Sequence, residues 1–169
     1  MSDGRPTLRR SQRIVVVGQP FRRRNTRLPD EDYRGERYVH LTVCTYRRQP
    51  LFRERVTADR TRALLLASFA DSLRLDAFCF MPDHLHVLIM AGESGLLRAF
   101  ARFKQVSAQA HRLAGGSRLW QRGFHDRILR RDEDLLRTIA YILDNPVRRG
   151  LCEDWQEWAY SWSRWAFEE

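Results

Sequence analysis

The chain has 169 residues, an ordinary hydrophobic content of 43%, and 30 lysines and arginines against 21 acidic residues, a net charge of +9. This length suits one domain with a core of normal size, and the composition excludes a fully disordered chain. Because Lys104 is the only lysine, nearly all of the positive charge is arginine, whose planar guanidinium matches pairs of phosphate oxygens. The composition therefore favours a nucleic-acid partner, although GC-rich coding is a second source of arginine.

The cysteines and the hydropathy pattern indicate a compartment. Cys44, Cys79 and Cys152 are odd in number, widely spaced and without a CxxC pair, which is typical of reduced thiols rather than of disulfides or a zinc knuckle. No apolar run approaches the length that spans a membrane. We expect a cytoplasmic protein without membrane contact.

The first 36 residues differ in composition from the rest. They are rich in arginine, include Arg22, Arg23 and Arg24, contain Pro6 and two further prolines, and have no sustained period. We predict a mostly flexible basic tail that can lie along phosphates, with a possible short strand at Ile14–Val17. Residues 37–169 are predicted to form a single domain whose tryptophan-rich C-terminal tail packs back on the body.

Hydrophobic periodicity predicts the elements of this domain in chain order. Alternation from Val39 to about Tyr46 predicts a strand, and Thr57 or Asp59 can open a helix. The apolar stripe expected on that helix comprises Ala63, Leu66, Ala67, Ala70 and Leu73. Later elements are a strand at 75–80, a strand carrying two histidines, a helix from 94 to the glycines at 115–116, a strand at 125–129 and a helix at 133–144 stopped by Pro146. This order predicts a ferredoxin-like α+β fold, an antiparallel sheet with helices mainly on one face.

The histidine strand follows a Pro82–Asp83 turn within the stretch FMPDHLHVLI. Because strand side chains alternate, His84 and His86 share one face while Leu85 and its alternate neighbours face the other way. Two imidazoles on one rigid face can ligate a metal together. Ordinary sheet polarity is the alternative.

The last helix supplies a candidate nucleophile. On a helical wheel, Tyr141 lies away from the apolar side, beside Asn145 one turn later. A solvent-facing tyrosine and an asparagine before proline are each common without a function. Combined with His84 and His86, they suit phosphodiester cleavage, in which a metal polarises the phosphate and a phenol attacks it. The mixed nitrogen and oxygen ligands favour Mg²⁺ or Mn²⁺ over structural zinc.

The segment MPDHLHVLI resembles the His-hydrophobic-His (HUH) motif of the single-tyrosine transposases. RFKQVSAQAHR, LWQRGFHDRILRRDEDLLRTIAYILDNPVRRGL and YSWSRW resemble the REP-associated tyrosine transposases (RAYTs) of that superfamily. The resemblance runs from about Tyr38 to Trp165; the first 35 residues do not take part. It implies an HUH-endonuclease fold with His84 and His86 as metal ligands, Tyr141 as the catalytic residue and Asn145 as the polar ligand. It also implies cleavage and rejoining of single-stranded DNA through a 5′-phosphotyrosine, at or near palindromic hairpins.

Several interpretations stay open at this point. Further DNA-binding candidates are Arg102, Lys104, Trp120, Arg122, Arg148 and Arg149, with core packing as the alternative for Trp120 and a solvated charge pair for the last two. Asp126 could orient a histidine or simply be edge-strand polarity, and His40 is interpreted as a structural residue. The alternative function is a non-catalytic module that binds hairpin DNA or RNA. The pattern does not distinguish a monomer from a homodimer that exchanges the tyrosine helix.

Overall fold

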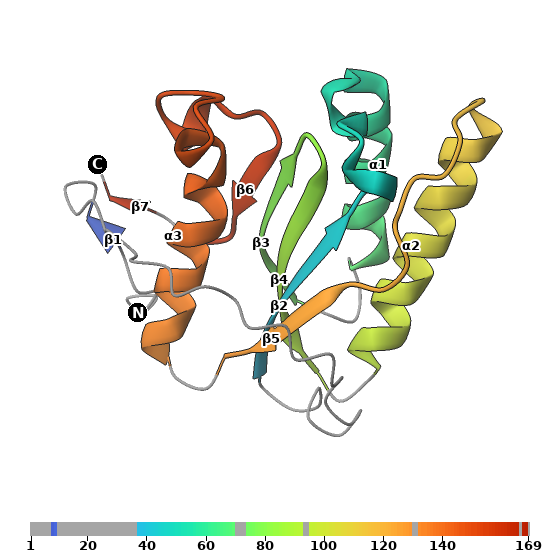
Figure 1. The fold of residues 1–169 in the computed structure, drawn as a ribbon. Coiled ribbons are helices and arrows are strands. Elements are labelled where there is room, and N and C mark those ends of the chain that lie inside the picture. The colour runs from blue at the N-terminus through green and yellow to red at the C-terminus, as the bar shows by residue number, and fades with distance from the viewer. Residues whose placement is uncertain are drawn as a thin grey trace.

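The computed structural model describes residues 8–9, 37–69, 74–92, 95–129, 132–165 and 167–168. Its main sheet has five antiparallel strands in the order β5-β2-β4-β3-β6 (Figure 1). These strands are β2 (Arg37–Cys44), β3 (Arg74–Met81), β4 (His84–Ala91), β5 (His125–Ile128) and β6 (Ser161–Ser163). A separate parallel pair joins β1 (Leu8–Arg9) to β7 (Phe167–Glu168), so two residues of the predicted tail form a strand. The other tail candidates, at 14–17 and 22–24, lie outside the described residues.

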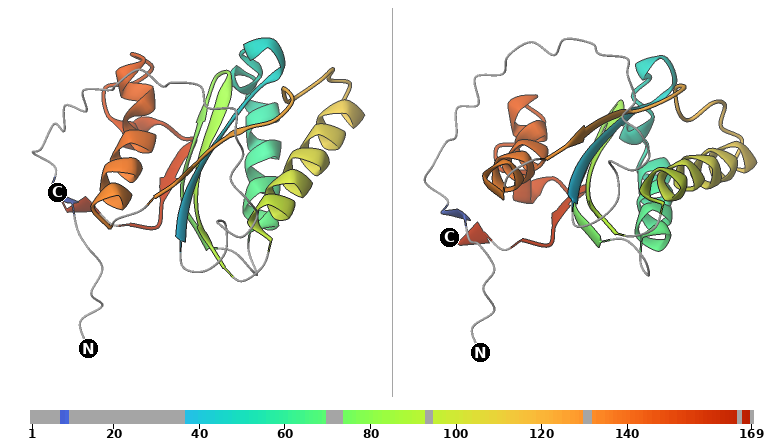
Figure 2. Two further views of the ribbon diagram at one scale, coloured as in Figure 1. Left: turned by 60° about the horizontal axis from the view of Figure 1, so that its bottom comes forward. Right: turned by 90° about the horizontal axis from the view of Figure 1, so that it is seen from below.

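Helices cover both faces of the sheet. Figure 2 shows α1 (Arg55–Ser68) and α2 (Leu96–Leu113) together on one face and α3 (Asp132–Arg148) on the other. Short 3-10 helices are η2 (Tyr46–Arg48), η3 (Leu51–Arg53) and η4 (Trp155–Glu157). The predicted α+β class and the order of the predicted elements are confirmed, with β6 as an added edge strand.

Strand alternation creates two hydrophobic cores. On the α1/α2 side, residues such as Val39, Leu41 and Leu85 pack with Phe100 and Phe103. On the α3 side the core comprises Ala77, Cys79, Met81, Leu88, Leu129, Leu135, Ile139, Ile142 and Leu143. Burial of each large apolar side chain contributes about 1.5–3 kcal/mol, so both helical layers are held firmly against the sheet.

The predicted inward stripe of α1 is wrong at Ala63, Leu66 and Ala67, which are exposed, while Ala70 and Leu73 lie outside the described residues. The buried residues of this helix are Thr57, Ala58, Thr61 and Leu65, whereas Leu66 is 45% exposed. Two polar residues are buried because their hydroxyls are satisfied locally: the Thr61 hydroxyl donates to the Thr57 carbonyl at 2.7 Å and the Thr57 hydroxyl to Glu54 at 3.1 Å. The apolar run at 64–67 circles the helix, which made the choice of face ambiguous.

Pro146 does not end α3, which continues to Arg148. Proline lacks the N–H that would bond the Ile142 carbonyl, and the Asn145 side-chain nitrogen approaches that oxygen at 3.4 Å and the Tyr141 carbonyl at 2.7 Å. The helix instead terminates at Gly150, where φ is +64°. Leu151 N–H bonds the Pro146 carbonyl and Gly150 N–H bonds the Val147 carbonyl, the pattern of a Schellman cap.

The C-terminal tail packs back on the domain as predicted. Trp155, Trp158 and Trp165 pack against the α3-side core, and the Trp158 indole donates to the Phe80 carbonyl at 2.9 Å. β6 then pairs with β3 at the sheet edge. None of the helices in the described part of the chain combines the length and apolar character needed to cross a membrane.

Candidate functional site

The two histidines of β4 meet on the face of the sheet that α3 covers. Their register partners on β2 are Cys44 for His84 and Thr42 for His86. Both residues are only 5% exposed, and their rings stand nearly perpendicular with centroids 4.8 Å apart. Their Nε2 atoms lie 3.1 Å from each other. The alternation predicted from the sequence therefore brings two ring nitrogens to a common point.

A carboxylate from the preceding turn fixes the orientation of His84. Asp83 Oδ1 lies 2.6 Å from His84 Nδ1, and Arg48 donates to Asp83 Oδ2 at 2.9 Å. Burial opposes the charge on Asp83, but the contacts with His84 and Arg48 hold the pKa of its carboxyl below the usual value. Because the carboxylate accepts the Nδ1 proton of His84, the Nε2 atom keeps its lone pair for a ligand.

His86 is oriented from β2. Its Nδ1 atom lies 3.0 Å from Thr42 Oγ1 and 3.1 Å from His40 Nε2. His40 is thus part of the site, which its alternation with apolar residues did not reveal. Burial lowers the pKa of all three imidazoles, that of His40 to about 4 with a contribution from Arg127. The histidines are therefore neutral near pH 7, the form that ligates metals.

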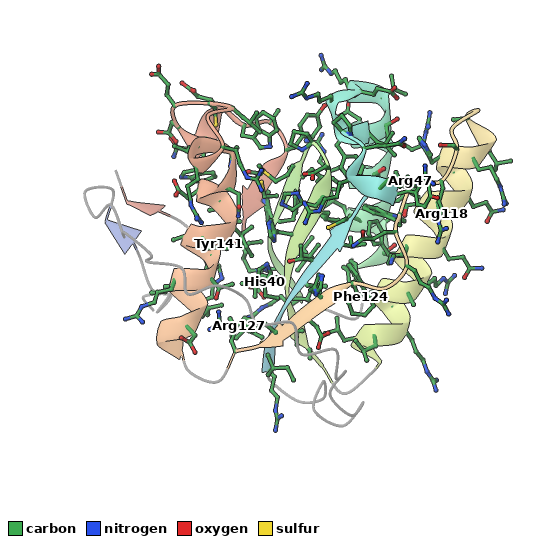
Figure 3. All side chains as sticks on the ribbon, in the orientation of Figure 1. His40, Arg47, Arg118, Phe124, Arg127 and Tyr141 are labelled. Carbon is green, nitrogen blue, oxygen red and sulfur yellow. The ribbon has the colours of Figure 1, made fainter. Side chains whose placement is uncertain are left out.

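Tyr141 reaches this cluster from α3. Its ring centroid lies 5.8 Å from that of His86 and 6.2 Å from that of His40, both in edge-on geometry. The guanidinium carbon of Arg148 lies 5.1 Å from the centroid of the tyrosine ring. Tyr141 is half-buried, so the polar side of α3 faces the histidines of the sheet. Figure 3 shows Tyr141 on α3 and His40 on β2.

Asn145 is buried one helical turn beyond Tyr141. Residues at spacings of four share one side of a helix, and Arg149, a further turn along, lowers the pKa of His84 and His86 by its charge, after burial as the main cause. Asn145 therefore lies on the side of α3 that carries Tyr141, which contacts His86, and Arg149, whose charge acts on both histidines. The Asn145 side-chain nitrogen donates to the Tyr141 carbonyl, so the amide oxygen is the side-chain atom that could still bind a metal.

Three exposed arginines surround the cluster. Arg148 and Arg149 come from the end of α3, and Arg127 on β5 pairs in register with His40 (Figure 3). Because the buried histidines are neutral, these guanidiniums supply the positive charge next to the tyrosine. Such an arrangement favours a phosphate group at this place.

The other candidates for DNA binding lie elsewhere. Arg102 is exposed on α2, across the sheet from the histidines, and Arg122 is exposed in the loop before β5. The Lys104 ammonium donates to the carbonyls of Gln121 at 3.2 Å and Gly123 at 2.5 Å, so it secures that loop. Trp120 is 4% exposed and its indole donates to Ser107 at 2.9 Å, which favours core packing. Arg22, Arg23 and Arg24 lie outside the described residues.

Of the two interpretations of Asp126, the structure favours edge-strand polarity over a role in orienting a histidine. Asp126 pairs in register with Leu41 and so lies on the α1/α2 side of the sheet, away from His84 and His86. Asp83 takes that role. Its position next to His84 in the sequence was the available signal, since a turn residue beside a ligand can fold back on it. No comparable feature of the sequence predicts that Thr42 and Arg127 lie at the site.

The donor set fits a divalent cation that keeps open positions. Within the described residues, no group of three or more His, Cys, Asp or Glu side chains is arranged to hold a metal. The two imidazoles, together with the Asn145 amide predicted from the sequence, are the donors that would hold one. Two nitrogens that occupy adjacent positions of an octahedral ion, each about 2.1 Å from it, are about 3.0 Å apart. The Nε2 separation of 3.1 Å matches this geometry. A structural zinc site would need four protein ligands.

An antiparallel sheet that carries a neutral histidine pair, opposite a helix that presents a tyrosine, defines the HUH class of single-tyrosine proteins. The family model described as "Transposase IS200 like" matches residues 35–145. The chain belongs to this transposase family, and the expected RAYT resemblance is confirmed.

Named relatives agree with this assignment. A protein of Haemophilus influenzae (strain ATCC 51907 / DSM 11121 / KW20 / Rd), provisionally named REP-associated tyrosine transposase, is 33% identical over 101 residues, which cover 50% of this chain and 56% of the relative. The REP-associated tyrosine transposase of Escherichia coli (strain K12) is 25% identical over 87 residues, 52% of each chain. The chain thus spans about half the length of these two curated relatives.

A solved structure shares the fold. It is described as a REP-associated tyrosine transposase bound to a REP hairpin, and it matches with a TM-score of 0.64 at 20% identity, covering 85% of this chain and 82% of that one. This likeness extends over the sheet and the three helices that position the site.

Proposed function

We propose that this transposase cleaves and rejoins single-stranded DNA at hairpin repeats through a covalent bond between Tyr141 and a 5′-phosphate, with a divalent metal held by His84, His86 and Asn145. The observation that carries the proposal is the edge-on contact of the Tyr141 ring with His86, whose Nε2 atom converges with that of His84. The proposed nucleophile and the two imidazoles proposed to bind the metal thus lie side by side in one chain.

The residues divide the reaction between them. The Tyr141 oxygen attacks the scissile phosphorus, the bond to the 3′-oxygen breaks, and the phosphate stays on the tyrosine. The phenolic proton passes to solvent and the leaving 3′-oxygen takes up a proton, so charge balances. Reversal by a 3′-hydroxyl restores a phosphodiester without ATP, because the phosphotyrosine retains the energy of the broken bond. Arg127, Arg148 and Arg149 hold the phosphate oxygens in line.

His84, His86 and Asn145 are the residues that would hold Mg²⁺ or Mn²⁺. The bound ion supplies Lewis-acid stabilisation of charge on the phosphate oxygens. Asp83, Thr42 and His40 act through the ligands, since each fixes the outer nitrogen of a histidine and so directs Nε2 inward.

The partner we infer is single-stranded or hairpin DNA. Support comes from the family, from the arginines around Tyr141 and from the related structure that is described as bound to a REP hairpin. Because α3 packs on the sheet of its own chain, we also infer that a monomer can assemble the whole catalytic set.

The test is covalent capture. Wild-type protein incubated with end-labelled hairpin DNA and Mn²⁺ should yield a denaturation-resistant, protease-sensitive adduct. Tyr141→Phe removes only the hydroxyl and should bind the same DNA without forming the adduct. His84→Ala should also lose cleavage but keep most of its DNA affinity, because arginine–phosphate contacts supply it.

Matched controls use the other tyrosines. An adduct that persists in Tyr141→Phe and disappears in Tyr46→Phe or Tyr160→Phe would reassign the nucleophile. Failure of the wild-type protein to form an adduct with any repeat hairpin, despite tight binding, would favour the non-catalytic binding module.

A further inference from the structure

The turn after β2 holds two arginines in an unusual backbone conformation. Arg47 and Arg48 both have φ of +54°, in the left-handed region that side-chain-bearing residues rarely adopt. Thr45 stabilises this turn: its hydroxyl donates to the Gln49 carbonyl at 2.6 Å and the Asp83 carbonyl at 3.0 Å. Strained residues that the surroundings enforce are concentrated at functional sites, so the display of these side chains needs an explanation.

The guanidiniums of Arg47 and Arg48 contact different partners. Arg48 turns to Asp83 and thereby belongs to the histidine site. Arg47 instead lies with its guanidinium carbon 5.3 Å from the centroid of the Tyr46 ring. Arg118, from a distant part of the sequence, lies 4.8 Å from the same ring. Figure 3 shows Arg47 and Arg118 beyond the end of β2.

Arg118 is held beside this ring by contacts of its own segment. Tyr46 N–H donates to the Leu119 carbonyl at 2.8 Å, which ties the turn to the segment carrying Arg118. The Arg118 Nε atom donates to the Trp120 carbonyl at 3.2 Å. Two exposed guanidiniums therefore lie beside one half-buried aromatic ring, and that of Arg118 is also held by the Trp120 carbonyl.

Neither of these cations has an acidic partner in the part of the chain that the structure describes. Among the described residues, no ion pair involves Arg47 or Arg118, although Arg48 beside them is paired with Asp83. Two like charges held together repel each other, and a polyanion would relieve this. The planar guanidinium of arginine can bond two phosphate oxygens at once. The Tyr46 ring orients both guanidiniums before a ligand binds.

The place of this cluster indicates which polyanion binds. Arg48 follows Arg47 directly and contacts Asp83, whose other oxygen contacts His84. A DNA strand that leaves the histidine pair past Asp83 and Arg48 would reach the turn that carries Arg47 and Tyr46, the residues that directly precede Arg48. We propose that Tyr46, Arg47 and Arg118 form a subsite for backbone phosphates of the single-stranded DNA that flanks the scissile bond. The inference rests on the proposed function and extends it to the path of the substrate.

The experiment measures the affinity of the full chain for a fluorescent single-stranded oligonucleotide at several salt concentrations, without divalent metal. The double variant Arg47→Asn/Arg118→Gln removes both charges, and asparagine tolerates the left-handed backbone at 47. Each phosphate contact with a single strand contributes about 0.7 to the slope of log affinity against log salt, so the slope should fall by about 1.4. Arg47→Lys keeps the charge and should keep the slope.

Arg98→Gln is the matched control for the single variant Arg118→Gln, because it removes one exposed arginine near the start of α2, whereas residue 118 follows the end of that helix. An unchanged slope in the double variant, or equal losses in Arg98→Gln and Arg118→Gln, would overturn the subsite. A second measurement uses a blunt hairpin without single-stranded flanks. The wild type and the double variant should bind this hairpin with the same affinity. Adduct formation by Tyr141 is measured separately, so a failed nucleophile assignment and a failed subsite give different results.

Discussion

Removal of the Asp83 carboxylate should weaken metal binding far more than removal of the arginine that contacts it. The two contacts differ in environment. Asp83 Oδ1 meets His84 Nδ1 at 2.6 Å, and the His84 side chain is only 6% exposed. Arg48 meets the other oxygen at 2.9 Å with its side chain 59% exposed. Water therefore replaces the arginine readily but does not replace the carboxylate at a buried ring.

The expected magnitudes follow from these environments. Loss of a partner that orients a ligating histidine lowers metal affinity by about 10- to 100-fold, so Asp83→Ala should raise the Kd for Mn²⁺ within that range. An exposed ion pair contributes at most about 1 kcal/mol, which is about fivefold in affinity, and this sets the ceiling for Arg48→Ala.

Titration calorimetry of Mn²⁺ into the metal-free 169-residue chain separates the two variants, since it measures binding without catalysis. Asp126→Ala is the control, because it removes one carboxylate on the opposite side of the sheet. An unchanged Kd in Asp83→Ala would refute the orienting role of the carboxylate. Equal losses of Mn²⁺ affinity in Asp83→Ala and Arg48→Ala would refute the argument that water replaces the exposed arginine but not the carboxylate.

Three further predictions concern the cap, the assembly and the tail. Gly150→Ala should lower the free energy of unfolding in urea by about 1 kcal/mol, since its φ is +64° and no atom would touch the new Cβ; a loss as large in Gly150→Asn would exclude this backbone cause. A mixture of His84→Ala and Tyr141→Phe should form no adduct on hairpin DNA in gel analysis, because both groups come from one chain; a restored adduct would indicate exchanged helices. Deletion of residues 1–35 should flatten the salt dependence of DNA affinity, and an unchanged slope would separate the tail from DNA binding.

Local periodicity was sufficient to predict much of the fold and the main pair of the site. The shared face of His84 and His86 depends only on strand alternation, which no tertiary contact alters. The order of elements likewise follows from hydrophobic patterns and from short connections such as the turn at Pro82, which forces an antiparallel pair.

The remaining features depend on contacts between segments far apart in the sequence. His40 enters the site because β2 pairs with β4 in a register that sets Thr42 opposite His86, and one-residue slippage would have turned it away. Pro146 is tolerated in α3 because a neighbouring amide bonds the carbonyl that proline cannot. Neither the register of two strands nor the rotamer of a side chain can be read from local composition.

The hydrogen bond from Asn145 to the Tyr141 carbonyl has a consequence for the thermodynamics of metal binding. Ordering a free side chain on binding costs about 0.5–1.5 kcal/mol in lost rotamer entropy. Here the amide nitrogen is already fixed at 2.7 Å from the Tyr141 carbonyl, so folding itself selects the rotamer of the proposed ligand. The same bond joins the proposed ligand to the backbone of the proposed nucleophile, so displacement of the Asn145 amide would be transmitted to Tyr141 through the helix. Glutamine at this position would add a rotatable bond and weaken both effects, which makes the short side chain part of the preorganisation of the site.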